Sequence, residues 1–158
     1  MEINKNVDED SSAERITQYL GSVGIASGIG VDRTPWSGAF LSWLINASGN
    51  KDHLVLSGAN ITIWNSAVAK RLTFLPGEKS ILPGDIAIFS RANPSVTNLD
   101  DLRAGKGSFT PSQSGIVYSS DADQFTTIEP NVGYAIRLRD HTISASKNII
   151  GFIRLSDQ

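Results

Sequence analysis

The stretch that decides the fold is Thr34-Pro35-Trp36-Ser37-Gly38-Ala39-Phe40-Leu41-Ser42-Trp43. Pro35 has a fixed φ and no N–H, which suits the entrance of a helix. Trp36, Phe40 and Trp43 recur at helical spacing and predict a helix over Pro35–Ala47 that closes near Gly49. The start of such a helix presents unpaired N–H groups and the positive end of its dipole, which stabilise an oxyanion or a thiolate. Ser37 occupies this place, so the stretch has the layout of a nucleophile mounted on a helix N-terminus.

Composition restricts the class of protein. The chain has 158 residues, 40% of them hydrophobic and 19% charged, as in an ordinary soluble globular domain. The net charge of −2 and the absence of any basic cluster argue against nucleic acid and acidic membrane surfaces as partners. The chain contains no Cys, which excludes disulfides and thiolate catalysis. With two His and no Cys, we expect no metal site and no cofactor.

The N-terminal residues are predicted to form a flexible, acidic tail. Met1–Asp10 is acidic and polar, unlike a signal peptide, and residues 11–158 are predicted to form a single domain. No apolar run is long enough to span a bilayer. We therefore expect a location in the cytoplasm, or release by lysis, by particle assembly or by a dedicated secretion machine.

Helices are predicted first along the chain. Ser11 or Ser12 would cap a helix that ends at Gly24 or Gly28. Its apolar face is formed by Ile16, Tyr19, Leu20 and Val23. The stretch Lys51–Leu72 carries both strand-like and helical patterns, and the helix propensity of Ala67–Arg71 favours a helix.

Strands follow the helices. Leu82-Pro83-Gly84-Asp85 is predicted to be a turn that leads into a buried strand, Ile86–Phe89. Arg91–Pro111 is polar and is interpreted as a long surface loop. Four further strands are predicted at Ser114–Ser119, Phe125–Glu129, Gly133–Arg139 and Ile149–Leu155. This order predicts an α+β domain whose N-terminal helices pack on a mostly antiparallel five-stranded sheet.

Several segments follow one another in a characteristic order. They are Trp36-Ser37-Gly38-Ala39-Phe40, Leu82–Phe89, Gln113-Ser114-Gly115-Ile116-Val117-Tyr118, Ile128–Gly133 and Gly151-Phe152-Ile153-Arg154. In this order they resemble motifs of the NlpC/P60 and CHAP peptidoglycan hydrolases, which have a papain-like fold. The resemblance covers about Thr34 to Leu155. The chain resembles in particular a branch that carries Trp-Ser in place of Trp-Cys.

The resemblance implies a set of site residues. In the superfamily a Cys attacks a cell-wall peptide bond, a His moves the proton, and a polar residue orients the His. By position, the nucleophile place is Ser37, the base place is Gln113, and the orienting place is Asn131 or, as the less favoured choice, Glu129. The resemblance also implies substrate-binding positions at Trp36, Gly38, Ser114 and Glu129. Gln cannot act as a general base near neutral pH, so the resemblance implies the fold more strongly than the activity.

Other residues have simpler interpretations. Ser37 also suits a plain helix N-cap, and a Cys→Ser change made to trap a hydrolase is a further alternative. His53 and His141 are expected to be exposed, with His141 in a turn, while Trp43 and Trp64 are expected in the core. Asp100-Asp101 and Asp121/Asp123 are expected to form turns. Arg137 and Arg139 should share one solvated face of the sheet.

Three functions are compatible with these observations. The leading one is a catalytically degenerate hydrolase-like domain that binds a peptidoglycan peptide or a protein partner in a groove beside Ser37. The second is an active peptidoglycan amidase or endopeptidase, or a trapped form of one. The third is an interaction module of a phage or phage-tail-like particle. The oligomeric state stays open.

Overall fold

The computed structural model describes residues 13–25, 36–92, 98–108, 110–130 and 136–155. Within these ranges the chain forms four α-helices, α1 (Ala13–Ser22), α2 (Ser37–Ala47), α3 (Asn60–Ala69) and α4 (Leu99–Arg103), and a short 3-10 helix, η3 (Ile143–Ala145). The strands are β1 (Thr73–Phe74), β2 (Ile86–Ser90), β3 (Ser112–Ser120), β4 (Gln124–Glu129), β5 (Arg137–Thr142) and β6 (Ile149–Ile153). The α+β class predicted from the sequence is confirmed.

The six described strands form one antiparallel sheet in the order β1-β6-β2-β3-β4-β5. The prediction of five strands is wrong, because the two-residue strand β1 pairs with β6 through Thr73↔Ile153 and Phe74↔Phe152. A strand this short shows no hydrophobic alternation and is formed only by its partner. The predicted strand Gly133–Arg139 is also displaced, since β5 runs to Thr142 and residues 133–135 lie outside the described ranges.

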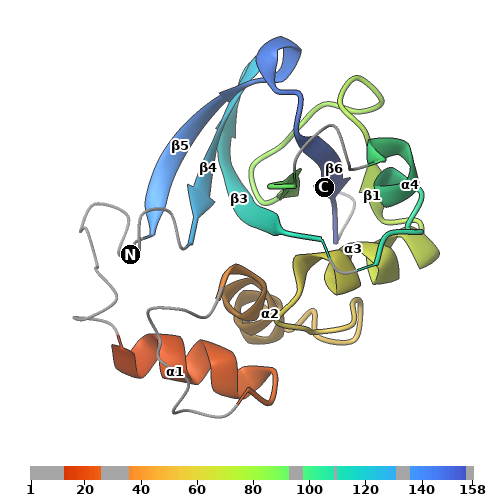
Figure 1. Ribbon diagram of the computed structural model, residues 1–158. Coiled ribbons are helices and arrows are strands. Elements are labelled where there is room, and N and C mark those ends of the chain that lie inside the picture. Colours follow the sequence, from red (N-terminus) through yellow and green to blue (C-terminus); the bar gives the residue numbers. More distant parts are fainter. Residues whose placement is uncertain (1–12, 26–35, 93–97, 109, 131–135, 156–158) are drawn as a thin grey trace.

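The helices α1, α2 and α3 gather on one side of the twisted sheet, as Figure 1 shows. This side is filled by a cluster in which Leu41 and Ile45 of α2 and Trp64 of α3 pack with Ile88 and Ile150 of the sheet. The opposite side carries a second cluster, formed chiefly by Phe74, Ala87, Phe89, Val117, Phe125 and Phe152. Burial of both faces explains why β2 and β6 are apolar at nearly every position.

The N-terminal helix is held by aromatic packing. Tyr19 of α1 contacts Trp36, Phe40 and Trp43, with ring centroids 6.0, 5.2 and 5.2 Å apart. Ile16 and Leu20 are buried in the same cluster, and this confirms the predicted apolar face of α1. Trp64 is fully buried and Trp43 is partly buried, as expected for core residues.

Two segments differ in part from the expectation. The helix favoured within Lys51–Leu72 is present as α3, but it begins only at Asn60 and turns precede it. The expected loop Arg91–Pro111 contains the short helix α4, in which Asn98 accepts hydrogen bonds from the backbone N–H groups of Asp100 and Asp101. Asp100-Asp101 therefore lie in a first helical turn, where carboxylates suit the helix dipole, instead of forming a turn of their own.

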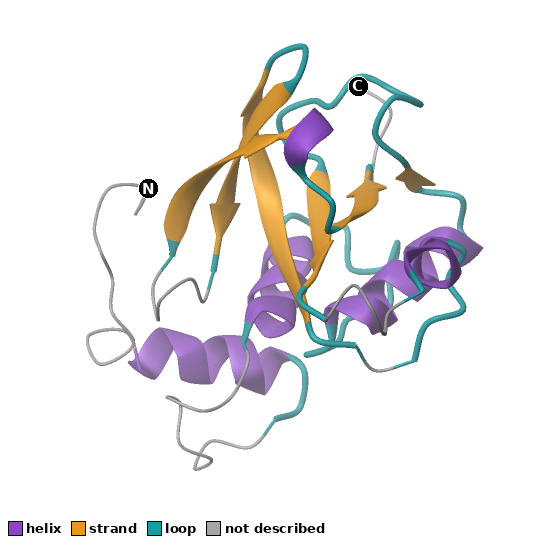
Figure 2. Cartoon of the chain, turned by 45° about the horizontal axis from the view of Figure 1, so that its top comes forward, coloured by secondary structure: helices purple, strands orange, loops and turns teal. Residues whose placement is uncertain are grey.

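No helix in the described ranges has the length and apolar character that a membrane crossing requires. The 3-10 helix η3 lies at the far end of the sheet from α1, between β5 and β6 (Figure 2). The sheet thus has one face covered by helices and one end where the β5–β6 connection leaves side chains accessible. A pocket forms at each of these two places.

Candidate functional site

Ser37 is the first residue of α2, and its side chain is almost fully buried. The cap position is Trp36, so the interpretation of Ser37 as the helix N-cap is wrong. The Ser37 hydroxyl accepts a hydrogen bond of 2.9 Å from Asn60 Nδ2. The Ser114 hydroxyl donates to the Ser37 carbonyl oxygen at 3.3 Å, and Asn60 Nδ2 also donates to the Ser112 carbonyl at 3.3 Å. Ser37 is therefore fixed between α3 and β3.

A groove of about 630 Å³ opens beside Ser37. Its exposed surface is mainly apolar, although polar residues also line it. The lining residues are Val23, Ile25, Ser37, Ser57, Gly58, Ala59, Asn60, Ile61, Arg91, Thr110, Pro111 and Ser112. The buried Asn60 Oδ1 has no hydrogen-bond partner within the described part of the chain. The groove thus combines an apolar lining with one unsatisfied acceptor and one Arg, a composition typical of ligand sites.

Gly38 and Trp36, two predicted substrate-binding residues, lie behind the wall of this groove and do not line it. A Cβ atom on Gly38 would lie 2.3 Å from the Gly58 carbonyl oxygen, so only Gly allows α2 to approach the 57–59 loop. Trp36 is buried in the aromatic cluster with Tyr19 and Phe40. Neither side chain lines the groove, and a direct role of either residue in binding a substrate stays a prediction.

Gln113 and Ser37 are not brought together. Side chains alternate along β3, so Gln113 points away from the helix-facing side on which Ser114 meets Ser37. Gln113 Nε2 donates to the Pro130 carbonyl, and Gln113 Oε1 is buried without a partner among the described residues. Asn131, the predicted orienting residue, lies outside the described ranges. Within those ranges, no titratable side chain is hydrogen-bonded to the Ser37 hydroxyl.

On the Gln113 side of the sheet, a buried polar cluster connects β4 and β5. Glu129 is only 1% exposed, and its Oε1 lies 2.6 Å from His141 Nε2 and accepts from the Thr127 hydroxyl at 2.7 Å. The His141 ring is stacked between Phe89 and Phe125, with centroids 4.7 and 4.9 Å away. Arg139 Nη1 lies 3.9 Å from Glu129 Oε2.

This cluster corrects the expectation that His141 is an exposed residue in a turn. Its side chain is 12% exposed and belongs to β5, whereas His53 is exposed as expected. Arg137 and Arg139 are both exposed, as expected, and Arg139 shares the face of His141 because residues two apart in a strand point the same way. The sequence did contain a signal for this cluster, the period-two spacing of Thr127 with Glu129 and of Arg139 with His141. The predicted strand Gly133–Arg139 ended before His141, so His141 was not assigned to a strand.

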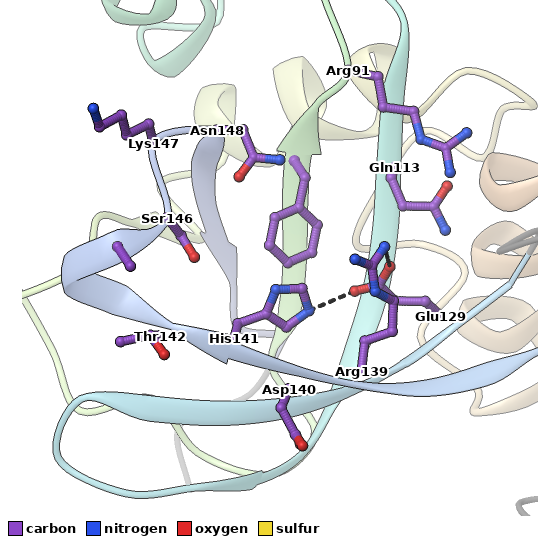
Figure 3. Close-up of a pocket in the computed structure, with 12 residues that line it drawn as sticks. Arg91, Gln113, Glu129, Arg139, Asp140, His141, Thr142, Ser146, Lys147 and Asn148 are labelled. Carbon is purple, nitrogen blue, oxygen red and sulfur yellow. Dashed lines mark hydrogen bonds and ion pairs between the residues drawn. The ribbon is translucent and has the colours of Figure 1, made fainter.

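A second pocket, of about 430 Å³, lies over this cluster. Figure 3 shows Gln113, Glu129, Arg139 and His141 along it, with Arg91 directed into the space beside Gln113. Asp140 points away from the pocket, where it accepts a hydrogen bond of 2.7 Å from the Thr126 hydroxyl. Glu129, predicted as a substrate-binding residue, thus lines this pocket and not the groove beside Ser37.

The comparisons with known proteins identify the family. The chain belongs to the family described as "Uncharacterized protein conserved in bacteria (DUF2272)", which it matches over residues 6–156. No curated protein and no solved structure matches the chain. The functional argument therefore rests on the geometry of the two pockets.

Proposed function

We propose that this DUF2272 member is a catalytically degenerate domain of the NlpC/P60–CHAP type, which binds a cell-wall-like peptide in the groove beside Ser37 without cleaving it. The observation that carries the proposal is the hydrogen bond from Asn60 Nδ2 to the Ser37 hydroxyl. A serine nucleophile needs a base that removes its proton, and an amide has no such capacity. Asn60 instead holds the hydroxyl in place as part of the groove wall.

The neighbouring strand gives Ser37 no base either. Ser112 and Ser114 are the β3 residues that contact the Ser37 and Asn60 pair, and neither titrates near neutral pH. The place that the resemblance assigns to the base is held by Gln113, whose amide group is engaged with the Pro130 carbonyl. This arrangement supports binding over hydrolysis.

The groove lining indicates what it binds. Val23, Ile25 and Ile61 offer apolar contact for a small aliphatic side chain. Asn60 Oδ1 is a buried acceptor that a peptide N–H would satisfy, because an unpaired buried acceptor costs about 1–3 kcal/mol. Arg91 borders the groove and would pair with a carboxylate. An apolar, acidic peptide fits these three features together, and peptidoglycan stem peptides have this chemistry.

Titration with soluble muropeptides tests the proposal. Backbone amide NMR signals of Ser57–Ile61 and Ser112 should shift saturably, and mass spectrometry should detect no cleaved peptide. Val23→Asp should weaken binding, because it places a carboxylate in the groove beside an acidic ligand. Val55→Asp is the matched control, since Val55 is 54% exposed and does not line the groove.

The outcomes separate the three functions. Peptide turnover that Ser37→Ala abolishes would establish an active hydrolase and overturn the proposal. Absence of any muropeptide binding would also overturn it and would favour a protein-interaction module. Saturable binding that is sensitive to Val23→Asp, insensitive to Val55→Asp and free of turnover is the expected result.

A further inference from the structure

The pocket over Glu129 and His141 is lined by a residue with a buried hydrogen-bond acceptor that has no donor within the described ranges. Gln113 is 4% exposed, and its Oε1 has no hydrogen-bond partner within the described ranges. The donation of Gln113 Nε2 to the Pro130 carbonyl fixes the orientation of the amide, so that the oxygen is the atom left over. Such an atom is costly unless a ligand supplies a donor.

Glu129 provides a second acceptor in the same pocket. Its Oε1 is used by Thr127 and His141, while its Oε2 lies 3.9 Å from Arg139 Nη1, beyond hydrogen-bond distance. Gln113 and Glu129 belong to neighbouring strands and share one face of the sheet: a Cβ on Gly115, two residues after Gln113, would meet Glu129 Cγ at 2.7 Å. The two acceptors thus offer a cationic group two partners.

Cationic side chains complement these acceptors. Arg91 and Arg139 both line the pocket, and Figure 3 shows Arg91 directed toward the space beside Gln113 and Arg139 lying next to Glu129. The carboxylate of Asp140 is directed away and is engaged by Thr126, so it does not neutralise them. Guanidinium groups that line one pocket can bind a carboxylate by charge-assisted hydrogen bonds.

We propose that this pocket binds a free α-amino acid. Its carboxylate pairs with Arg91 and Arg139, and its ammonium donates to Gln113 Oε1 and to Glu129. A zwitterion matches both sets of groups, whereas a simple anion leaves Gln113 Oε1 unsatisfied and is repelled by Glu129. The volume of about 430 Å³ is within the range of small-molecule sites and leaves room for a side chain. This site is distinct from the groove proposed for peptides, although Arg91 borders both.

Calorimetric titration of the full chain with each common amino acid, and with acetate, methylamine and inorganic phosphate, tests the proposal. At least one amino acid should bind saturably and shift the NMR signals of the Gln113 side-chain amide and of His141. Acetate and methylamine should each bind at least about tenfold more weakly, because each lacks one of the two charged contacts. Phosphate should also bind more weakly, because its greater negative charge faces Glu129.

Two variants assign the site. Arg139→Gln should weaken amino-acid binding at least about tenfold and leave muropeptide binding in the Ser37 groove unchanged, since Arg139 lines only this pocket. Gln113→Met should weaken it too, and Arg139→Gln keeps the test valid if Gln113→Met does not fold. Lys147→Gln is the control, because Lys147 lies at the rim with its ammonium directed away (Figure 3).

Several results would overturn the proposal. It fails if no amino acid binds, if acetate or phosphate binds as tightly as the best amino acid, or if Lys147→Gln weakens binding as much as Arg139→Gln. A failure of this kind leaves the peptide groove untouched, because the muropeptide titration reports on Ser57–Ile61 and Ser112 instead.

Discussion

Asp85 and Arg154, 69 residues apart in the chain, form a two-point ion pair. Arg154 Nε donates to Asp85 Oδ1 and Nη2 to Oδ2, each at 2.7 Å, and Asp85 Oδ2 also accepts from the Leu82 N–H at 2.8 Å. Asp85 is 2% exposed, and the Arg154 guanidinium lies 4.9 Å from the Phe74 ring. The pair fastens the start of β2 to the end of β6, where Ile86 is opposite Ile153.

Removing one partner of this pair should destabilise the domain strongly. Arg154→Met leaves a buried carboxylate without its cation and should lower the free energy of unfolding by about 3–5 kcal/mol. The double variant Asp85→Asn/Arg154→Met should lose less than the sum of the single variants, because the uncompensated charge is gone. Urea unfolding followed by Trp fluorescence measures both. An additive double variant would contradict the assigned coupling.

Gly38→Ala should destabilise the groove wall. The new Cβ would meet the Gly58 carbonyl oxygen at 2.3 Å, which forces α2 and the 57–59 loop apart. We expect a loss of about 1–3 kcal/mol in the free energy of unfolding, as for overpacked cores. Gly21→Ala in α1 is the matched control, because nothing lies within 4 Å of its Cβ position and the change improves helix propensity. Equal effects of the two changes in urea unfolding would refute the close-approach argument.

His141→Phe should destabilise the β4–β5 pair even though it preserves an aromatic ring between Phe89 and Phe125. The change removes the partner of the buried Glu129 Oε1, and a buried carboxylate that loses a hydrogen bond costs about 1–3 kcal/mol. His53→Phe is the control, because His53 is exposed and its replacement should stay within about 0.5 kcal/mol. Thermal unfolding of the two variants side by side decides whether the Glu129 contact matters.

Asp123 should titrate below the ordinary range of an Asp. The Ser144 hydroxyl donates to Asp123 Oδ2 at 2.6 Å, and the Ser144 N–H donates to Oδ1 at 3.0 Å. Both hydrogen bonds lower the pKa of the Asp123 carboxyl, and the bond from the hydroxyl has the larger effect. Because the folded pKa is lower than the unfolded one, the stability that this group contributes is present above the unfolded pKa and is lost as pH falls through the folded pKa. Carbon-detected NMR titration should find a higher pKa for Asp123 in Ser144→Ala. An unchanged pKa would show that the hydroxyl bond is not formed in solution.

Hydrophobic spacing and turn residues in the sequence were enough to predict several helices, strands and turns. The spacing of Ile16, Tyr19 and Leu20 predicted the buried face of α1, and the Pro-Trp-Ser entrance predicted a helix that begins near Ser37. The residues Pro83-Gly84-Asp85 also predicted the turn before β2. In the structure Gly84 has a φ of +94°, which residues other than Gly rarely adopt. In each case neighbouring residues alone determine the conformation.

The candidate site was less predictable, because it depends on which strands pair and in which register. A shift of one residue reverses the face of every side chain in a strand, and this decides that Ser114, and not Gln113, meets Ser37. The same pairing brings Glu129 and His141 within 2.6 Å and builds the second pocket, although His141 stands in none of the motifs recognised in the sequence. The sequence by itself determined the α+β class, the entrance of α2 and the buried strand β2, since these follow from local periodicity and turn chemistry. Only the tertiary structure decided which polar side chains meet, because contacts between distant strands are set by sheet register and packing.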